Sequence, residues 1–345
     1  MVKSSVVLIF SAIMTLCLGG CVSIVENTEP DVIAVISKND KGSFWHGALA
    51  GAEDAALENG YAITFRGPEV TGREGVKNQK ELIQLALDNK VRGIVIAAAG
   101  PGLMEQMDMA DSRDLPVIQF ESGLHPLDLS RLKQEKKNPV IASVYTHNRK
   151  AGALAAEELF RKIRRDISLS MIPYVVGVIQ HDMSAAGENR AQGFLERFRE
   201  LADEDPETVG KYNLVLHKCV SEKNNTYVRA LNSLMEQRVR AVFLTNQDTV
   251  EQIYDEICVH PGKYDYLVFT GFDAGLKQIH WMRSDLGAKL IGSVTQNSYD
   301  IGYHAILQCI NGLEARGVTA FVELSGVWYE PENLDEMISK NLVYE

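Results

Sequence analysis

The sequence predicts two doubly wound α/β lobes, each built on a parallel β-sheet with helices on both faces. Short β-branched segments alternate with amphipathic segments of helical spacing along most of the 345 residues. The strand segments are almost wholly apolar, as in parallel sheets covered on both sides. The alternation runs through two stretches of similar content, and the chain is too long for one ordinary core, so two lobes are expected.

The first stretch supplies one lobe. Its opening unit is an apolar strand at 32–37 followed by a helix at 45–59 with its alanines on one face. Gly60 follows that helix, where glycine commonly ends a helix. Further strands are expected at 61–66, 91–97, 115–120 and 140–144, with helices at 74–89 and 104–112.

The second stretch repeats the pattern. Its strands are expected at 174–180, 213–220, 240–245, 266–270 and 290–295. Helices are expected at 148–165, 188–202, 226–238, 249–258 and 274–284. A late helix at 299–311 and a strand at 319–324 remain after this run.

The N-terminal residues predict export. Lys3 precedes an apolar run at 6–18, which is too short to span a membrane, and Leu18-Gly19-Gly20-Cys21 follows. Small residues directly before a cysteine resemble the bacterial lipobox, in which cleavage precedes the cysteine and its sulfur carries a diacylglycerol. We expect a signal peptide at 1–20, lipidated Cys21 and a tether at 21–30, which places the protein outside the cytoplasm, at the cell surface or in the periplasm. An ordinary signal peptide with an incidental cysteine is the alternative.

Composition excludes several classes of function. The formal net charge is −11, and no basic cluster offsets it, so the chain is not expected to bind nucleic acid. Cys219, Cys258 and Cys309 lack the paired spacing of metal or redox sites; core thiols are expected, and one disulfide is the alternative. The sequence motifs of common hydrolases, nucleotide-binding proteins and zinc proteases are missing, so we expect no enzyme, no cofactor and no metal.

Polar residues follow many of the predicted strands. In open α/β sheets, ligands bind beyond the carboxyl ends of the strands. The residues at these ends include few cations, which suits a neutral polyol better than a phosphate. Five of them are Asn39, Glu121, Asn246, Asp273 and Gln296.

An ordered set of segments resembles the ribose/galactose branch of the type I periplasmic binding proteins, from Ile33 to Leu342. The matching segments are Ala34-Val35-Ile36-Ser37, Phe44-Trp45, Gly51-Ala52, Gly60-Tyr61, 91–96, 115–118, Arg190 with Gly193-Phe194, 241–243 with Asn246, Gly271-Phe272-Asp273, and Gln296 with Ile301-Gly302.

The resemblance implies two lobes that are joined by three crossing strands and close on a sugar. The lobes would comprise 31–143 plus 297–326, and 144–296 plus 327–345. It further implies a monomeric binding protein that delivers its ligand to the membrane permease of an ABC importer. A sensor that signals to a membrane receptor or histidine kinase is the alternative. A transcription regulator of the same core is excluded, because a signal peptide stands where a helix-turn-helix should precede the first strand.

The resemblance also assigns ligand contacts by position. Phe44 and Trp45 would form walls of the site, while Ser37 and Asn39 would shape the first loop. Glu121 falls where the family usually has aspartate, and Arg190 where it has its second-lobe arginine. Asn246, Asp273 and Gln296 match the family's own residues. Ser122 replaces a second arginine and neither Ser221 nor Glu222 is aromatic, so ribose bound in the standard way is not expected.

Some of these residues have a purely structural alternative. Asp273 precedes a predicted helix and could cap its N-terminus. Phe44 or Trp45 could belong to the core. His147 and His181 are isolated from other metal-type ligands and are interpreted as loop residues.

The anchor is directly testable. Cys21→Ser should yield soluble or uncleaved protein, because the remaining tether is too polar to hold a membrane. Membrane fractionation measures this, with Cys258→Ser as the control that should stay membrane-bound. Normal signal cleavage with unchanged membrane retention of Cys21→Ser would contradict the lipoprotein assignment.

Overall fold

The computed structural model describes residues 30–40, 43–70, 72–137, 139–219, 226–340 and 342–343. Cys21, the predicted signal peptide and Ser221–Glu222 lie outside this part of the chain. Lipidation therefore stays a prediction. In the described residues, no helix is both long and apolar enough to cross a membrane.

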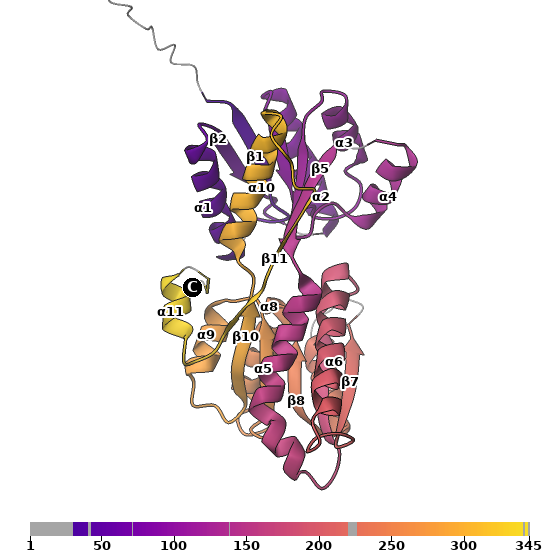
Figure 1. Ribbon diagram of the computed structural model, residues 1–345, viewed down its shortest axis with the longest axis vertical. Coiled ribbons are helices and arrows are strands. Elements are labelled where there is room, and N and C mark those ends of the chain that lie inside the picture. Colours follow the sequence, from indigo (N-terminus) through magenta and orange to yellow (C-terminus); the bar gives the residue numbers. More distant parts are fainter. Residues whose placement is uncertain are drawn as a thin grey trace, which may run out of the picture. The chain divides into compact units, whose positions relative to one another are not determined.

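The first lobe is a six-stranded parallel sheet in the order β11-β5-β4-β3-β1-β2. Its strands are β1 (Val32–Ile36), β2 (Ala62–Arg66), β3 (Gly93–Ile96), β4 (Val117–Phe120), β5 (Val140–Thr146) and β11 (Phe321–Leu324). Its helices are α1 (Ser43–Glu58), α2 (Gly72–Asp88), α3 (Met104–Asp111), α4 (Pro126–Gln134) and α10 (Ser298–Leu313). Figure 1 shows α10, which is late in the sequence, beside α1.

The second lobe repeats this order as β12-β10-β9-β8-β6-β7. Its strands are β6 (Tyr174–Gln180), β7 (Tyr212–Lys218), β8 (Val239–Leu244), β9 (Val268–Phe272), β10 (Lys289–Thr295) and β12 (Val327–Tyr329). Its helices are α5 (Asn148–Leu169), α6 (Ala185–Glu204), α7 (Thr226–Glu236), α8 (Gln247–Val259), α9 (Leu276–Arg283) and α11 (Leu334–Ser339). All of its strand pairs are parallel except β12 with β10.

Each sheet is covered on both faces. Trp45 and Phe120 belong to a core under α1 and α10, while Ile83 and Met107 belong to a second core under α2, α3 and α4. The second lobe has the same two-sided arrangement, with Phe194 in the core under α5 and α6. Burial on both faces explains why the strands are nearly uninterrupted apolar runs.

The chain passes between the two sheets three times. These passages lie between β5 and α5, between β10 and α10, and between β11 and β12. In Figure 1 the ribbon follows each of them. They confirm the predicted two-lobed fold with a three-strand connection.

Three short elements were not predicted. Helix α4 begins at Pro126 in a stretch to which no element was assigned, with the His125 side chain accepting a hydrogen bond from the backbone of Leu127. Strand β12 has only three residues, and α11 has six. Strand β12 and helix α11 carry too few residues for a periodic pattern, so they form mainly through tertiary contacts. Helix α4, with nine residues, is longer than the predicted helix α3, so its length does not explain why it was missed.

Candidate functional site

Asp273 is the first residue after β9 and lies among several polar groups. Its φ of 63° is in the left-handed region, a conformation that aspartate tolerates better than most residues. Its Oδ1 accepts a hydrogen bond from Nε2 of Gln296 at 2.6 Å. Its Oδ2 lies 3.4 Å from the backbone N of Gln247, at the start of α8, and 3.7 Å from Nη1 of Arg190. The Asp273 side chain is therefore held by an amide, a guanidinium and the N-terminus of a helix.

Arg190 comes from the first turns of α6 and is 4% exposed. Its Nε donates to Oδ1 of Asn148 at 2.7 Å, and its Nη1 donates to the carbonyl oxygen of Thr245 at 3.0 Å. The guanidinium carbon lies 3.7 Å from the ring centroid of Phe272, a cation–π contact. These partners compensate the loss of hydration that burial imposes on the charge.

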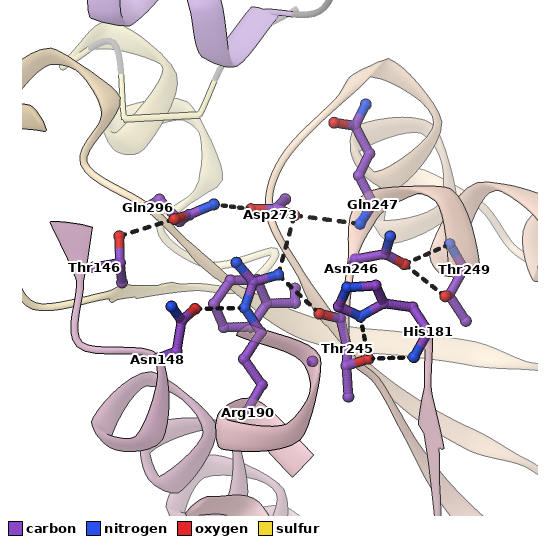
Figure 2. Close-up of polar contacts among 12 residues, drawn as sticks. Thr146, Asn148, His181, Arg190, Thr245, Asn246, Gln247, Thr249, Asp273 and Gln296 are labelled. Atoms are coloured by element: carbon purple, nitrogen blue, oxygen red, sulfur yellow. Dashed lines mark hydrogen bonds and ion pairs between the residues drawn. The ribbon is translucent and has the colours of Figure 1, made fainter. Parts of the chain in front are cut away.

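Gln296 follows β10 and links the acid to the inter-lobe connection. Its Oε1 accepts from the hydroxyl of Thr146 at 2.9 Å, and both side chains are buried. This bond fixes the amide so that Nε2 faces Asp273. Figure 2 shows the resulting chain of contacts from Thr146 through Gln296 and Asp273 to Arg190 and Asn148.

Asn246 lies beside this network but serves a helix. It is the N-cap of α8, where its Oδ1 accepts from the backbone N of Thr249 at 3.0 Å and from the Thr249 hydroxyl at 2.6 Å. Its oxygen is thus committed to α8, and a ligand would meet its Nδ2.

Glu121 holds the corresponding place at the end of β4 in the first lobe. It has a φ of 54°, and Nζ of Lys38 lies 3.1 Å and 3.0 Å from its two carboxylate oxygens. Burial raises the pKa of Glu121, but the Lys38 charge, the Ser122 hydroxyl and the more distant Arg190 charge outweigh it and lower the pKa below its usual value. Glu121 is consequently a carboxylate at neutral pH.

The two aromatic residues predicted to form walls of the site, Phe44 and Trp45, differ in burial. Trp45 is 5% exposed and packs edge-on against Phe120, with ring centroids 5.7 Å apart. Phe44 is half-buried and meets Trp45 edge-on at 4.9 Å. Nζ of Lys38 lies 6.0 Å from the Trp45 ring centroid. Trp45 is thus a core residue, and Phe44 is the more accessible of the two rings.

Ser37 and Asn39 lie in the loop after β1. The Ser37 side chain is buried, and its hydroxyl donates to the carbonyl oxygen of Asn39 at 2.6 Å. The Ser37 hydroxyl therefore stabilises the loop through a hydrogen bond to its backbone. Asn39 is half-buried. The Ser37 hydroxyl also lies 3.3 Å from the carbonyl oxygen of Arg66, so it is bonded within the first lobe.

His181 follows β6 and belongs to the same polar region. Its Nδ1 lies 2.7 Å from the Thr245 hydroxyl, and its side chain is 10% exposed. Burial and then the Arg190 charge lower the pKa of His181 to about 4, so the imidazole is neutral at pH 7. Within the described residues, no cluster of three His, Cys, Asp or Glu side chains could hold a metal.

The structure brings three of the predicted residues into contact, namely Arg190, Asp273 and Gln296, with Asn246 beside them. Sequence reasoning missed Lys38, Thr146, Asn148, Thr245 and His181. These five residues also lie at or near the ends of strands, as Asp273 does. Their side-chain types alone did not distinguish residues of the site from ordinary loop residues.

The capping interpretation of Asp273 is wrong. Helix α9 begins at Leu276, its N-cap is Gly275, and it has no side-chain capping bond. The predicted strand at 266–270 lies two residues later in the structure, at 268–272, so Asp273 adjoins the strand end and the site.

The contribution of the Arg190–Asp273 ion pair to stability can be tested with Asp273→Asn. Asparagine would keep an N-cap, but it removes the charge beside buried Arg190, so the free energy of unfolding should fall by about 1–2 kcal/mol. Urea unfolding of the ligand-free protein measures this. The control is Asp335→Asn, whose side chain is 90% exposed in its pair with Arg283 and should change stability by less than about 0.5 kcal/mol. Equal stability of Asp273→Asn and the parent would show that the Arg190 pair contributes nothing.

The chain is similar in sequence and fold to proteins of a known family. A family model described as "Periplasmic binding protein domain" matches residues 33–316. No curated protein matches significantly. A solved structure from Brachyspira murdochii, described as an "ABC transporter, LacI family transcriptional regulator", is 29% identical, with a TM-score of 0.79 over 92% of this chain and 99% of that one.

Two further solved structures share the fold. A solute-binding protein from Agrobacterium vitis with bound D-fucose is 23% identical, with a TM-score of 0.68 over 91% of this chain and 100% of that one. A carbohydrate solute-binding protein from Agrobacterium radiobacter in complex with D-arabinose is 21% identical, with a TM-score of 0.68 over 91% and 99%. With the family model spanning both lobes, the chain belongs to the periplasmic binding proteins of the type I fold.

Proposed function

We propose that this protein is an extracytoplasmic substrate-binding lipoprotein that captures a monosaccharide, or a similar small polyhydroxylated ligand, for an ABC importer. The observation that carries the proposal is the Asp273–Arg190–Gln296 network at the carboxyl ends of the strands. A carboxylate accepts hydroxyl hydrogens, whereas a guanidinium and an amide donate to hydroxyl oxygens. The network can therefore accept the hydrogen of a ligand hydroxyl and also donate a hydrogen bond to its oxygen.

The ligand contacts proposed are those predicted from the sequence: Ser37, Asn39, Phe44, Trp45, Glu121, Arg190, Asn246, Asp273 and Gln296. The contacts above support Glu121, Arg190, Asp273 and Gln296 most strongly, because Glu121, Asp273 and Gln296 have a carboxylate or amide group at a strand end and Arg190 of α6 lies beside Asp273. Asn246 would contribute Nδ2, and Phe44 an apolar wall. Ser37 and Trp45 would act mainly by shaping the loop and the wall.

The role in transport rests on family membership. The similar structures from Agrobacterium species hold D-fucose and D-arabinose, which supports a monosaccharide as ligand. The protein would act without chemistry or cofactor, as a monomer held to the membrane by lipid on Cys21, and pass the sugar to a permease. Its lobes would comprise 31–143 plus 297–326 and 144–296 plus 327–345.

A thermal-shift screen of neutral monosaccharides tests the proposal. A ligand that binds only the folded state raises stability by about 2.7 kcal/mol at 100 times its Kd, a shift of roughly 5 °C in Tm for a protein of this size. At least one sugar should produce such a shift. Asp273→Asn should weaken binding more than about tenfold, because an amide presents a donor where the carboxylate accepted. Asp335→Asn should bind normally, and a screen with no shift from any sugar would contradict the proposal.

A further inference from the structure

The two lobes repeat the same local arrangement, so their site residues can be compared position by position. Glu121 follows β4 and Asp273 follows β9, strands with the same place in their sheets. Both residues have positive φ, 54° and 63°. Their backbone N atoms donate to Val144 at 3.0 Å and to Val294 at 2.8 Å, on the next strand of each sheet. Glu121 is therefore the first-lobe equivalent of Asp273.

The helices can be matched in the same way, through two glycine contacts in each lobe. A Cβ on Gly152 of α5 would lie 2.0 Å from the carbonyl oxygen of Arg190, and one on Gly302 of α10 would lie 1.9 Å from that of Ala48. Three residues later, Gly193 of α6 and Gly51 of α1 make the reciprocal contacts to α5 and α10. Ala48 thus occupies the place of Arg190.

This equivalence shows that the first lobe has no cation at the helix position. The Ala48 methyl is buried and carries no charge. The cation beside Glu121 comes instead from the loop after β1. Nζ of Lys38 lies 3.1 Å and 3.0 Å from the two carboxylate oxygens of Glu121.

The position of Lys38 also has an equivalent. Ile36 of β1 pairs with Ile96, and Ile179 of β6 pairs with Leu244, in matching registers. Two residues after each isoleucine stand Lys38 and His181. In the second lobe the helix supplies the charged base and the strand end a neutral imidazole, whereas in the first lobe the strand end supplies the charged base. Each lobe therefore presents one cation beside one carboxylate.

We propose that Lys38 binds the ligand directly, and that Lys38 with Glu121 is the first-lobe counterpart of the Arg190–Asp273 pair. An ammonium has three N–H donors, and two face the Glu121 oxygens, so one remains for a ligand oxygen. The side chain is accessible, with 38% exposure for Lys38 against 12% for Glu121. The inference rests on the proposed function and extends its ligand site.

The two pairs define the class of ligand. Lys38 and Arg190 balance Glu121 and Asp273, and Asp248, whose pKa is raised by burial and then by the Asp273 charge, adds a further acidic group near them, so no cation is left over for an anionic ligand. A neutral molecule with hydroxyls on two opposite edges satisfies both pairs, each carboxylate accepting a hydrogen and each cation donating one. An anionic sugar would place its charge near two carboxylates that already neutralise the cations. The site is thus specific for neutral polyols over uronic acids and sugar phosphates.

Calorimetric titration of Lys38 variants tests the inference. The probe is whichever of D-fucose, D-arabinose, D-allose and D-tagatose, the sugars held by similar structures, binds the wild type most tightly. Lys38→Met keeps the chain length without the charge and should raise Kd at least about tenfold. Lys38→Arg should stay within about threefold of the wild type. Lys77→Met, which removes an exposed lysine paired with Glu74, should bind normally.

A second variant guards against misfolding. If Lys38→Met unfolds because Glu121 is left unpaired, the double variant Lys38→Met with Glu121→Gln removes both charges, and it should bind the sugar more weakly than Glu121→Gln alone; equal affinity of these two variants would count against a contact from Lys38. D-galacturonate should bind the wild type at least about tenfold more weakly than the best neutral sugar. Wild-type affinity in folded Lys38→Met would overturn the inference while leaving the proposed function intact. Failure of the wild type to bind any of these sugars would instead contradict the proposed function.

Discussion

The ion pair between Arg190 and Asp273 is the interaction on which the rest of the candidate site depends. A guanidinium that is 4% exposed is tolerated only if its charge and its donors have partners. Asn148, Thr245 and Phe272 satisfy the arginine, and Gln296 orients the acid. These residues lie on α5, α6 and at the ends of β8, β9 and β10, so the site forms only when the second lobe is complete. Because Thr146 holds Gln296, the network also reaches the connection between the lobes.

The two lobes place their carboxylates at equivalent positions but take the neighbouring cations from different elements. At equivalent strand ends, Glu121 and Asp273 share a positive φ and a backbone hydrogen bond to the next strand, so each lobe carries one carboxylate at the same place. The cation is less constrained by the backbone and comes from a helix in one lobe and from a loop in the other. A site built from two such pairs distributes its polar groups over both lobes, so a single ligand that contacts all of them must lie between them.

The sequence predicts the architecture well because apolar strands and amphipathic helices alternate with little interruption. Its failures have physical causes: α11 and β12 are too short to show a period, and Asp273 looked like a cap because the helix after it was placed two residues early, at 274 instead of 276. The family resemblance found Arg190, and strand-end position found the acid and the amide of the network. It could not find Lys38 as the partner of Glu121, because the two are 83 residues apart and only the β1–β3–β4 order brings them together. Nor could it show that Ser37 and Trp45 are buried by their neighbours.

One ligand should be held by both lobes at once. Each charge pair lies within one lobe, so a single ligand can contact both pairs only when the lobes are closed, and the ligand should shift the population of lobe orientations towards closure. Small-angle X-ray scattering of the wild type, with and without the neutral monosaccharide that binds most tightly, measures this directly. The radius of gyration should be smaller with the sugar bound. An unchanged radius of gyration at saturating sugar would contradict it, since the ligand would then be held without movement of the lobes.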